Sequence, residues 1–335
     1  MSEHHEHSIF GEKKYINFKY SLNGLSVLSM ICFLSYIPIC IILVKSILVY
    51  VKNRNAHDNK GLYPVLFQQF LMMQTMCLLH VFTRFITSRI PQTGFITSWC
   101  AAEKPEKTLR ILVFILYGVL YSQYASTLIF CGLRVFFMFS MKGIQKKIHK
   151  YITVLSMMTV PIAFCLAIPR YLSPATCAPL GSPFPNGAAL IMTLIDDETD
   201  EIAPSVFIDL VVEPVTAILI LSSEALMFFK LNANKKVRHK SQCNMHAKAE
   251  KVVTVTMILI MAPVLFNVSI AVFAFLHNFH AHYIMFIMQP FCVEAQSHVI
   301  TCYFFFTHPV FKKKKKIPII VLTTSFKDES NVQHF

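Results

Sequence analysis

The sequence predicts an all-α membrane protein: a seven-transmembrane helix bundle with its N-terminus outside the cell and its C-terminus in the cytosol. The composition, a series of long apolar runs and the placement of the basic residues predict this class. Of the 335 residues, 55% are hydrophobic and 15% are charged, whereas soluble domains carry about 25% charged residues. A soluble globule cannot bury this much apolar surface, so a single polytopic membrane domain is the expected class.

Seven apolar runs are long enough for membrane-spanning helices, which need roughly 17–25 residues. Each span must be helical, because lipid offers no partner to the open edge of a strand. The fourth run is the shortest, and six residues separate the sixth run from the seventh. In chain order the runs are Leu25–Val51, Leu62–Phe82, Ile111–Leu133, Ile152–Ile168, Ala203–Phe229, Val252–Leu276 and Tyr283–Phe306.

Lysine and arginine are concentrated on alternate connections between these runs. The connections after spans 1, 3 and 5 and the C-terminal tail hold 20 of the 31 basic residues, against 7 in the N-terminal segment and the other connections. Cytoplasmic loops carry the basic excess, which predicts an extracellular segment 1–24, a seven-helix domain 25–307 and a basic cytosolic tail 308–335. The net charge of +13 then reflects topology and attraction to anionic inner-leaflet lipids, and nucleic-acid binding is not needed to explain it.

Two of the ten cysteines stand apart from the others. Seven cysteines lie within the apolar runs, and Cys243 lies in the third cytosolic connection. Cys100 and Cys177 fall in outward connections, where oxidising conditions permit a disulfide. We therefore predict a Cys100–Cys177 bridge between the connection before span 3 and the connection between spans 4 and 5. The alternative is two free or lipid-facing thiols, and we favour the bridge because thiols outside the cell tend to pair.

Ionisable residues inside the spans are the best pointers to function, since such residues usually face the interior of a bundle. Asp209, Glu213 and Glu224 fall within about 60° of one another around the fifth span at 100° per residue. We expect a ligand cavity between spans 2, 3, 5 and 7 that opens to the outside. The alternative for each residue is structural, such as tyrosines that only pack or an arginine that pairs with Asp209. The candidate ligand-binding residues are Arg84, Arg110, Tyr117, Tyr121, Asp209, Glu213, Glu294 and His298.

Arg134 and Glu224 both lie near the cytosolic ends of their spans. We hypothesise that they form a signalling switch, paired at rest and separated when the helices move. The alternative is that Arg134 extends to the phosphate headgroups, as long basic side chains often do.

The stretch "RIPQTGFITSWCAAE" at 89–103 resembles the signature of the nematode serpentine chemoreceptors, in particular serpentine receptor class U. The features that carry the resemblance are Ile-Pro, Thr-Gly and Thr-Ser-Trp-Cys before span 3, with "YINFKY" at 15–20 in support. The resemblance implies a G-protein-coupled-receptor-like protein that binds a small external ligand and signals through a heterotrimeric G protein. It also implies a place in the plasma membrane, in the cilium of sensory neurons. The chain departs from rhodopsin-like receptors at "CGLRVFF", where Arg134 has no acidic neighbour.

The sequence contains no catalytic constellation: no phosphate loop, no His-Glu-x-x-His and no nucleophile elbow. We therefore expect no enzyme activity and no cofactor. We also expect no metal, because the His-rich stretch at 277–282 lacks Cys or acidic ligands at structural spacing and the one at 4–7 lies at the chain end. A small-solute secondary transporter that uses the carboxylates of spans 5 and 7 is the alternative function, although the repeated halves of such transporters are not visible. A ligand-gated channel of the insect chemoreceptor kind would need the opposite orientation.

Overall fold

The computed structural model describes most of the chain, and the statements below concern the described residues. The backbone is described for residues 8–53, 64–103, 105–139, 145–181, 184–193, 204–235, 252, 254–256, 258–260, 265–266, 269, 279–308 and 311. Side chains are not described for residues 53, 64, 145–150, 204–207, 209–210, 231–235 and 279–290.

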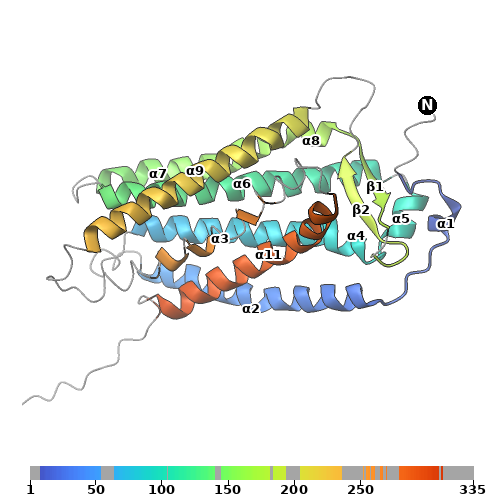
Figure 1. Ribbon diagram of the computed structural model, residues 1–335, viewed down its shortest axis with the longest axis horizontal. Helices are drawn as coiled ribbons and strands as arrows, with labels where there is room; N and C mark the ends of the chain where they lie inside the picture. Colours follow the sequence, from blue (N-terminus) through green and yellow to red (C-terminus); the bar gives the residue numbers. More distant parts are fainter. Residues whose placement is uncertain are drawn as a thin grey trace, which may run out of the picture.

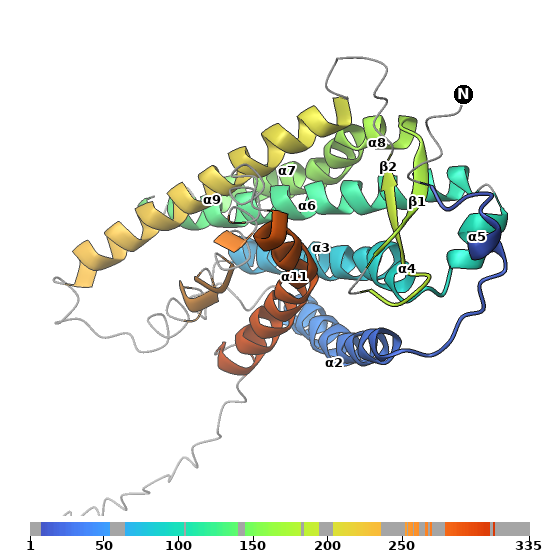
Figure 2. The same cartoon turned by 45° about the vertical axis from the view of Figure 1, so that its right-hand side comes forward.

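Long helices form an elongated bundle (Figure 1). α6 is the central helix: it packs against α3, α7 and α9, while α11 packs against α2 and α3. α11 runs obliquely to its neighbours in both views of the molecule (Figures 1 and 2). The long helices are α2 (Gly24–Asn53), α3 (Pro64–Arg84), α6 (Glu106–Phe139), α7 (Gln145–Leu166), α9 (Pro204–Lys235) and α11 (Phe279–Thr307).

Five helical stretches of the described chain are long and apolar enough to cross a membrane, and they coincide with the first five predicted spans. They are Gly24–Lys52, Val65–Gln92, Glu106–Phe139, Tyr151–Leu172 and Val211–Lys230. α11 occupies the place of the seventh span with 29 helical residues. The sixth predicted span, 252–276, lies largely outside the described residues. The helical class and these five spans are thus confirmed, and the orientation of the termini stays a prediction.

The second span is longer than the sequence analysis predicted. After Arg84 the helix passes through a π-helical turn, η3 (Phe85–Arg89), and ends in the short helix α4 (Ile90–Gln92). Pro91 is the second residue of α4, and because the helix continues from η3 without a break, its missing N–H removes one hydrogen bond from this last turn. The boundary predicted at Phe82 was therefore wrong, and Arg89 belongs to a spanning helix and not to a loop.

A small assembly of short helices and a hairpin lies at one end of the bundle (Figure 2). It combines segment 8–12, α1 (Lys13–Ile16), α5 (Thr97–Ala102) and an antiparallel hairpin of β1 (Ala175–Pro179) and β2 (Ala189–Thr193). We call these elements the cap. The sequence analysis predicted no strand, so the hairpin corrects the all-helical expectation. Beside it, α8 (Ile168–Leu172) continues the direction of α7.

Candidate functional site

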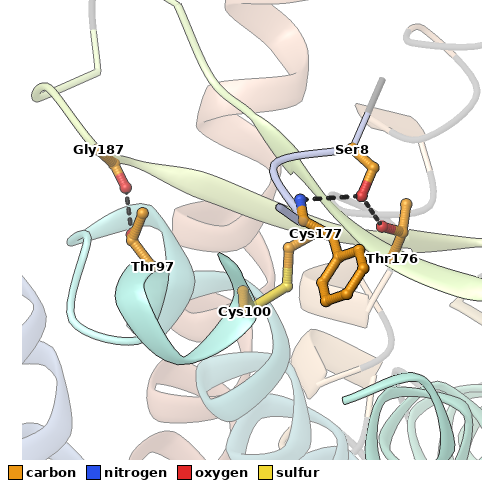
Figure 3. Close-up of a disulfide and its surroundings, with 7 residues drawn as sticks. Ser8, Thr97, Cys100, Thr176, Cys177 and Gly187 are labelled. Carbon is orange, nitrogen blue, oxygen red and sulfur yellow. Dashed lines mark hydrogen bonds between the residues drawn. A yellow bond between two sulfur atoms is a disulfide. The ribbon is translucent and has the colours of Figure 1, made fainter. Parts of the chain in front are cut away.

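The cap is held by the predicted disulfide. Cys100 of α5 is bonded to Cys177 of β1, with a Cα–Cα distance of 6.2 Å (Figure 3). Both half-cystines are 2% exposed and lie in an apolar cluster with Leu109 and Val113 of α6. Trp99 packs half-buried against the same cluster. The bridge therefore joins the elements before and after the α6–α7 pair, and the disulfide prediction is confirmed.

The segment before α1 is part of this cap. The Ile9 N–H donates to the Cys177 carbonyl and the Gly11 N–H to the Ala101 carbonyl, both at 3.0 Å. The Ser8 and Thr176 hydroxyls are 2.7 Å apart (Figure 3), and Ile9 is fully buried. Backbone bonds to two elements combined with apolar burial fix the segment in place. Residues 8–11 are thus held against the two elements that the disulfide joins.

Polar contacts join the elements at the cap end of the bundle. Asn23 Nδ2 donates to the Thr93 carbonyl at 3.1 Å, which links the start of α2 to the end of α4. The Arg170 guanidinium of α8 donates to Thr193 Oγ1 of β2 at 2.7 Å and lies 4.4 Å from the centroid of the Tyr117 ring of α6. A displacement of the hairpin would therefore change the contacts of Arg170 in α8, and through Arg170 those of Tyr117.

A buried ion pair lies between η3 and α11. The Arg89 Nε and Nη2 groups donate to the Glu294 carboxylate at 3.3 Å, with side chains 3% and 12% exposed. The guanidinium also lies 3.8 Å from the centroid of the Phe291 ring, a cation–π arrangement. Buried charges are tolerated only with such compensation. The pair consequently ties the cap end of the second span to α11.

His298 extends this polar layer to α2. Its Nε2 lies 2.9 Å from Ser35 Oγ, and its Nδ1 lies 2.6 Å from the Glu294 carbonyl on its own helix. The Tyr36 ring lies 5.7 Å from the imidazole, and its hydroxyl is within the electrostatic range of the Glu294 carboxylate. The structure therefore brings the predicted residues Glu294 and His298 together with α2, which the sequence analysis did not include.

Arg84 and the tyrosines of α6 lie near the same layer. Arg84 is within electrostatic range of Tyr117, Tyr124 and Glu294. The Tyr117 and Tyr121 rings are 5.9 Å apart, and Tyr121 is 3% exposed against apolar residues of α7 and α9. Tyr121 has the packing environment of a core residue, whereas Tyr117 contacts both Arg170 and Tyr121.

The other predicted ligand-binding residues have different surroundings. Arg110 pairs with Glu106 one turn earlier on α6, with side chains 31% and 30% exposed. Glu213 is exposed, although its carboxylate accepts a bond from the Tyr124 hydroxyl at 3.3 Å. The side chain of Asp209 lies outside the described residues. The acidic residues of the fifth span do not share one environment, since Glu224 is 4% exposed.

Arg134 and Glu224 lie in one buried region away from the cap. Arg134 Nη2 donates to Thr254 Oγ1 at 2.7 Å, and the Cys131 thiol is 3.9 Å from a Glu224 carboxylate oxygen. Both charged side chains are 4% exposed, and the guanidinium is within electrostatic range of the carboxylate. Arg134 is buried inside the bundle, which favours a partner there over contact with headgroups.

Sequence reasoning missed Arg89 as a site residue. Arg89 opens the motif "RIPQTGF" and was assigned to a polar loop, because apolar character falls off after Phe82. The helix nevertheless continues, and Arg89 is buried together with Thr87. If the helix were continued at 100° per residue, Arg89 would lie about 140° around the axis from Arg84. Its partner Glu294 becomes visible only in the structure, where the π turn brings Arg89 to α11.

These features define a polytopic helical membrane protein with a disulfide-bonded cap over a buried charged layer. Comparison with known families identifies it further: residues 9–314 match the family model of the serpentine type seven-transmembrane GPCR chemoreceptors, Sru. The chain belongs to this family. It is 30% identical over 187 residues to serpentine receptor class U-26 of Caenorhabditis elegans, over 54% of this chain and 62% of that protein. The chain thus spans about three fifths of the length of the curated relative that it matches.

The family match bears on the predicted function. Membership of a family of seven-transmembrane chemoreceptors agrees with the resemblance inferred from residues 89–103. The match is to a receptor family and not to an enzyme family, and it does not favour the transporter alternative. The function of the site is therefore considered below for a multi-pass membrane protein of this chemoreceptor family.

Proposed function

We propose that the protein is a chemosensory receptor of the plasma membrane that binds a small external molecule beneath the cap and signals to a heterotrimeric G protein inside. The observation that carries this proposal is the polar layer of buried Arg89 and half-buried Glu294 and His298 under a disulfide-bonded cap, in a member of a chemoreceptor family. Charged groups at membrane depth are rare and mark functional sites. Family membership supports the class of function, and the charged layer supports the position proposed for the ligand site.

The proposed orientation has the cap outside and the opposite end in the cytosol. A disulfide persists in an oxidising compartment, and Cys100–Cys177 lies in the cap. The basic excess of the alternate connections and of the tail 308–335 favours the same orientation. Accessibility of an epitope fused to the N-terminus on intact cells tests it, and an epitope that antibodies reach only after permeabilisation would contradict it.

The ligand proposed for this layer is a small molecule with a polar group and an apolar body. Arg84, Glu294 and His298 offer donors and acceptors, and Tyr117, with the core residue Tyr121 packed beside it, offers an aromatic face, a frequent combination in small-molecule sites. Asp209, Glu213 and Arg110 complete the proposed set. Contact with Glu294 would compete with Arg89, so binding of the ligand would act on the bond between η3 and α11.

The signal would leave through the Arg134–Glu224 region. A ligand shifts a helix bundle only by favouring one of its arrangements. In the proposed switch, movement of α9 or of residues around Thr254 changes the partners of Arg134, and the basic cytosolic connections meet the G protein. By resemblance, the cilium of sensory neurons is the proposed location.

Second-messenger output in cells that express the full chain, measured against a panel of volatile and soluble compounds, tests the proposal. An active compound should lose most of its effect on Glu294→Gln at equal surface expression. Glu103→Gln, which changes an exposed carboxylate of the cap end, should respond like the unchanged protein. An active compound whose response survives Glu294→Gln unaltered would remove this layer from the ligand site.

A further inference from the structure

Apolar side chains are exposed where the chain passes from the cap into α2 (Figure 1). Tyr20 is 41% exposed, Leu22 69% and Phe95 63%. The Tyr20 and Phe95 rings lie edge to face with their centroids 5.5 Å apart, although they come from the segments before α2 and after α4. We call these three side chains the corner surface.

Hydrogen bonds hold this corner in place. The Tyr20 hydroxyl donates to Ser26 Oγ at 2.8 Å, and Ser26 Oγ donates in turn to Asn23 Oδ1 at 3.0 Å. The Asn23 amide donates to the Thr93 carbonyl, and Thr93 Oγ1 accepts the Phe95 N–H at 3.3 Å. The two rings thus extend from one hydrogen-bonded group, so their outward position is built into the fold.

The same segment buries an aromatic ring where the cap offers a surface for it. Phe18 is half-buried and packs so closely against Gly187 that no Cβ atom would fit there. Tyr20 and Leu22 follow shortly after it and are exposed instead. Contiguous apolar areas that stay exposed in a folded chain mark surfaces for a protein partner or a membrane. The corner surface therefore needs a partner outside this chain.

The corner surface lies at the level where α2 enters the membrane. α2 has 30 residues and is therefore about 45 Å long, which matches the roughly 40–45 Å of a bilayer with its headgroup regions. Its first turn then lies among the headgroups. Because the Tyr20 hydroxyl is bonded to Ser26 in that turn, the Tyr20 ring lies at the same level.

The exposed apolar character continues from the corner surface into α2. Leu22 precedes the helix by two residues. Since α2 crosses the membrane, its own exposed apolar side chains face lipid. In the first three turns these side chains are Val27, Leu28, Met30, Ile31 and Leu34. The partner that covers this side of α2 therefore also adjoins the corner surface.

The chemistry of the corner suits the boundary between lipid and water. Tyrosine combines an apolar ring with a polar hydroxyl, and such rings are enriched at the level of the headgroups. Lys19, next to Tyr20, is exposed, and a long lysine side chain can run along apolar surface while its ammonium group reaches a phosphate. A second copy of the chain or a peptide would have to displace the lipid that already borders α2 at this level.

We propose that the corner surface binds phospholipid of the leaflet on the cap side of the membrane. The Tyr20 and Phe95 rings lie at the level of the lipid ester groups, and Lys19 meets a phosphate. Because Asn23 and Thr93 belong to the same hydrogen-bonded group as the rings, this contact anchors the joint between α2 and α4 at the membrane surface.

Tryptophan fluorescence tests the proposal, because Trp99 is the only tryptophan of the chain. In the background Trp99→Phe, the change Phe95→Trp places a single reporter on the corner surface. The purified full chain is placed in nanodiscs, one copy in each, with phospholipids brominated either near the ester groups or near the ends of the acyl chains. Bromine near the ester groups should quench the reporter several-fold more strongly than bromine near the chain ends.

Glu12→Trp in the same background is the matched control. Glu12 is also exposed, but it adjoins α1, which lies beyond the start of α2 at the far end of the cap (Figures 1 and 2). Iodide in the buffer should quench this reporter, and neither lipid should quench it strongly. A reporter at position 95 that behaves like the control would show that the corner surface lies in water, and this would overturn the proposal. Stronger quenching by chain-end bromine, or shielding from both iodide and lipid, would also overturn it.

Leu22→Trp in the Trp99→Phe background provides a second reporter if Phe95→Trp does not fold. Leu22 is the most exposed of the three side chains, so a larger ring meets little crowding there. The same preference for bromine near the ester groups is expected, and its absence would contradict the proposal as clearly as at position 95. Neither a ligand nor a G protein takes part in these measurements, so their outcome is independent of the proposed function.

Discussion

Two arginine–glutamate regions lie inside the described part of the bundle, and their bonding differs. Near the cap, Arg89 meets Glu294 through three hydrogen bonds at 3.3 Å. Away from the cap, Arg134 donates to Thr254 and Glu224 lies beside the Cys131 thiol. The first region is a direct ion pair that joins η3 to α11. In the second, a hydroxyl and a thiol are among the contacts of the charges, and Arg134 lies within electrostatic range of Glu224.

The difference indicates which end of the bundle is the more rigid. The Arg89–Glu294 pair stands below a disulfide and below backbone bonds from the segment around Ile9. Breaking a buried ion pair is strongly destabilising, so elements at this end should move together. Exchange among hydroxyl, thiol and carboxylate partners changes the energy less, because each charge retains a hydrogen bond. We expect conformational change to be largest in the region of Arg134 and Glu224.

The largest expected effect comes from breaking the pair near the cap. Glu294→Ala leaves the Arg89 guanidinium buried without its carboxylate and should destabilise the protein by about 3–5 kcal/mol. Thermal denaturation in nanodiscs, followed by the fraction that remains monodisperse, measures it. Glu103→Ala, at an exposed position, is the control. A loss in Glu294→Ala no larger than in the control would mean that the two regions do not differ.

Loss of the disulfide should be the next largest effect. Cys100→Ser opens a cross-link with a sequence separation of 77 residues, and loss of a native disulfide typically costs about 2–5 kcal/mol. Surface expression and thermal midpoint should fall together. Cys165→Ser changes an exposed free cysteine and should have little effect. Labelling of Cys100 by a membrane-impermeant maleimide before reduction would contradict the bridge on intact cells.

An exchange of charges tests the region away from the cap. Arg134→Glu and Glu224→Arg should each abolish signalling, and the double variant should restore part of it, because charges in contact couple by about 0.5–3 kcal/mol. Second-messenger output at equal surface expression is the measurement. Additive losses in the double variant would show that Arg134 and Glu224 act separately and would remove the proposed switch.

The parts of the fold that follow from local composition could be predicted from the sequence. Apolar runs of sufficient length identify spanning helices whatever their neighbours, and two cysteines on one side of the membrane identify a disulfide. The hairpin could not be predicted, because five-residue strands such as Ala189–Thr193 are defined by their partner strand and by the helices below. The segment around Ile9 is likewise buried only by contacts with β1 and α5.

The site was predictable only in part for the same reason. Glu294 and His298 stood out as polar residues within an apolar run, and the structure brings them together. Arg89 did not, since its burial depends on a π turn that carries the helix beyond its apolar run. Arg110 shows the opposite case, because its predicted place near a ligand does not reveal that Glu106 already lies within reach on the same helix.

The Arg110–Glu106 pair provides the smallest expected effect and the scale for the others. Both side chains are about one third exposed, and ion pairs between residues i and i+4 of an exposed helix face contribute about 0.3–0.5 kcal/mol. Glu106→Gln should therefore shift the thermal midpoint by about 1–2 °C at most, and high salt should reduce the shift further because exposed pairs are screened. The same salt series should leave the effect of Glu294→Ala nearly unchanged, since the Arg89 side chain is only 3% exposed. A salt-sensitive effect at Glu294 would show that the charged layer near the cap is open to solvent, and the contrast between a rigid and an adjustable end would then lose its basis.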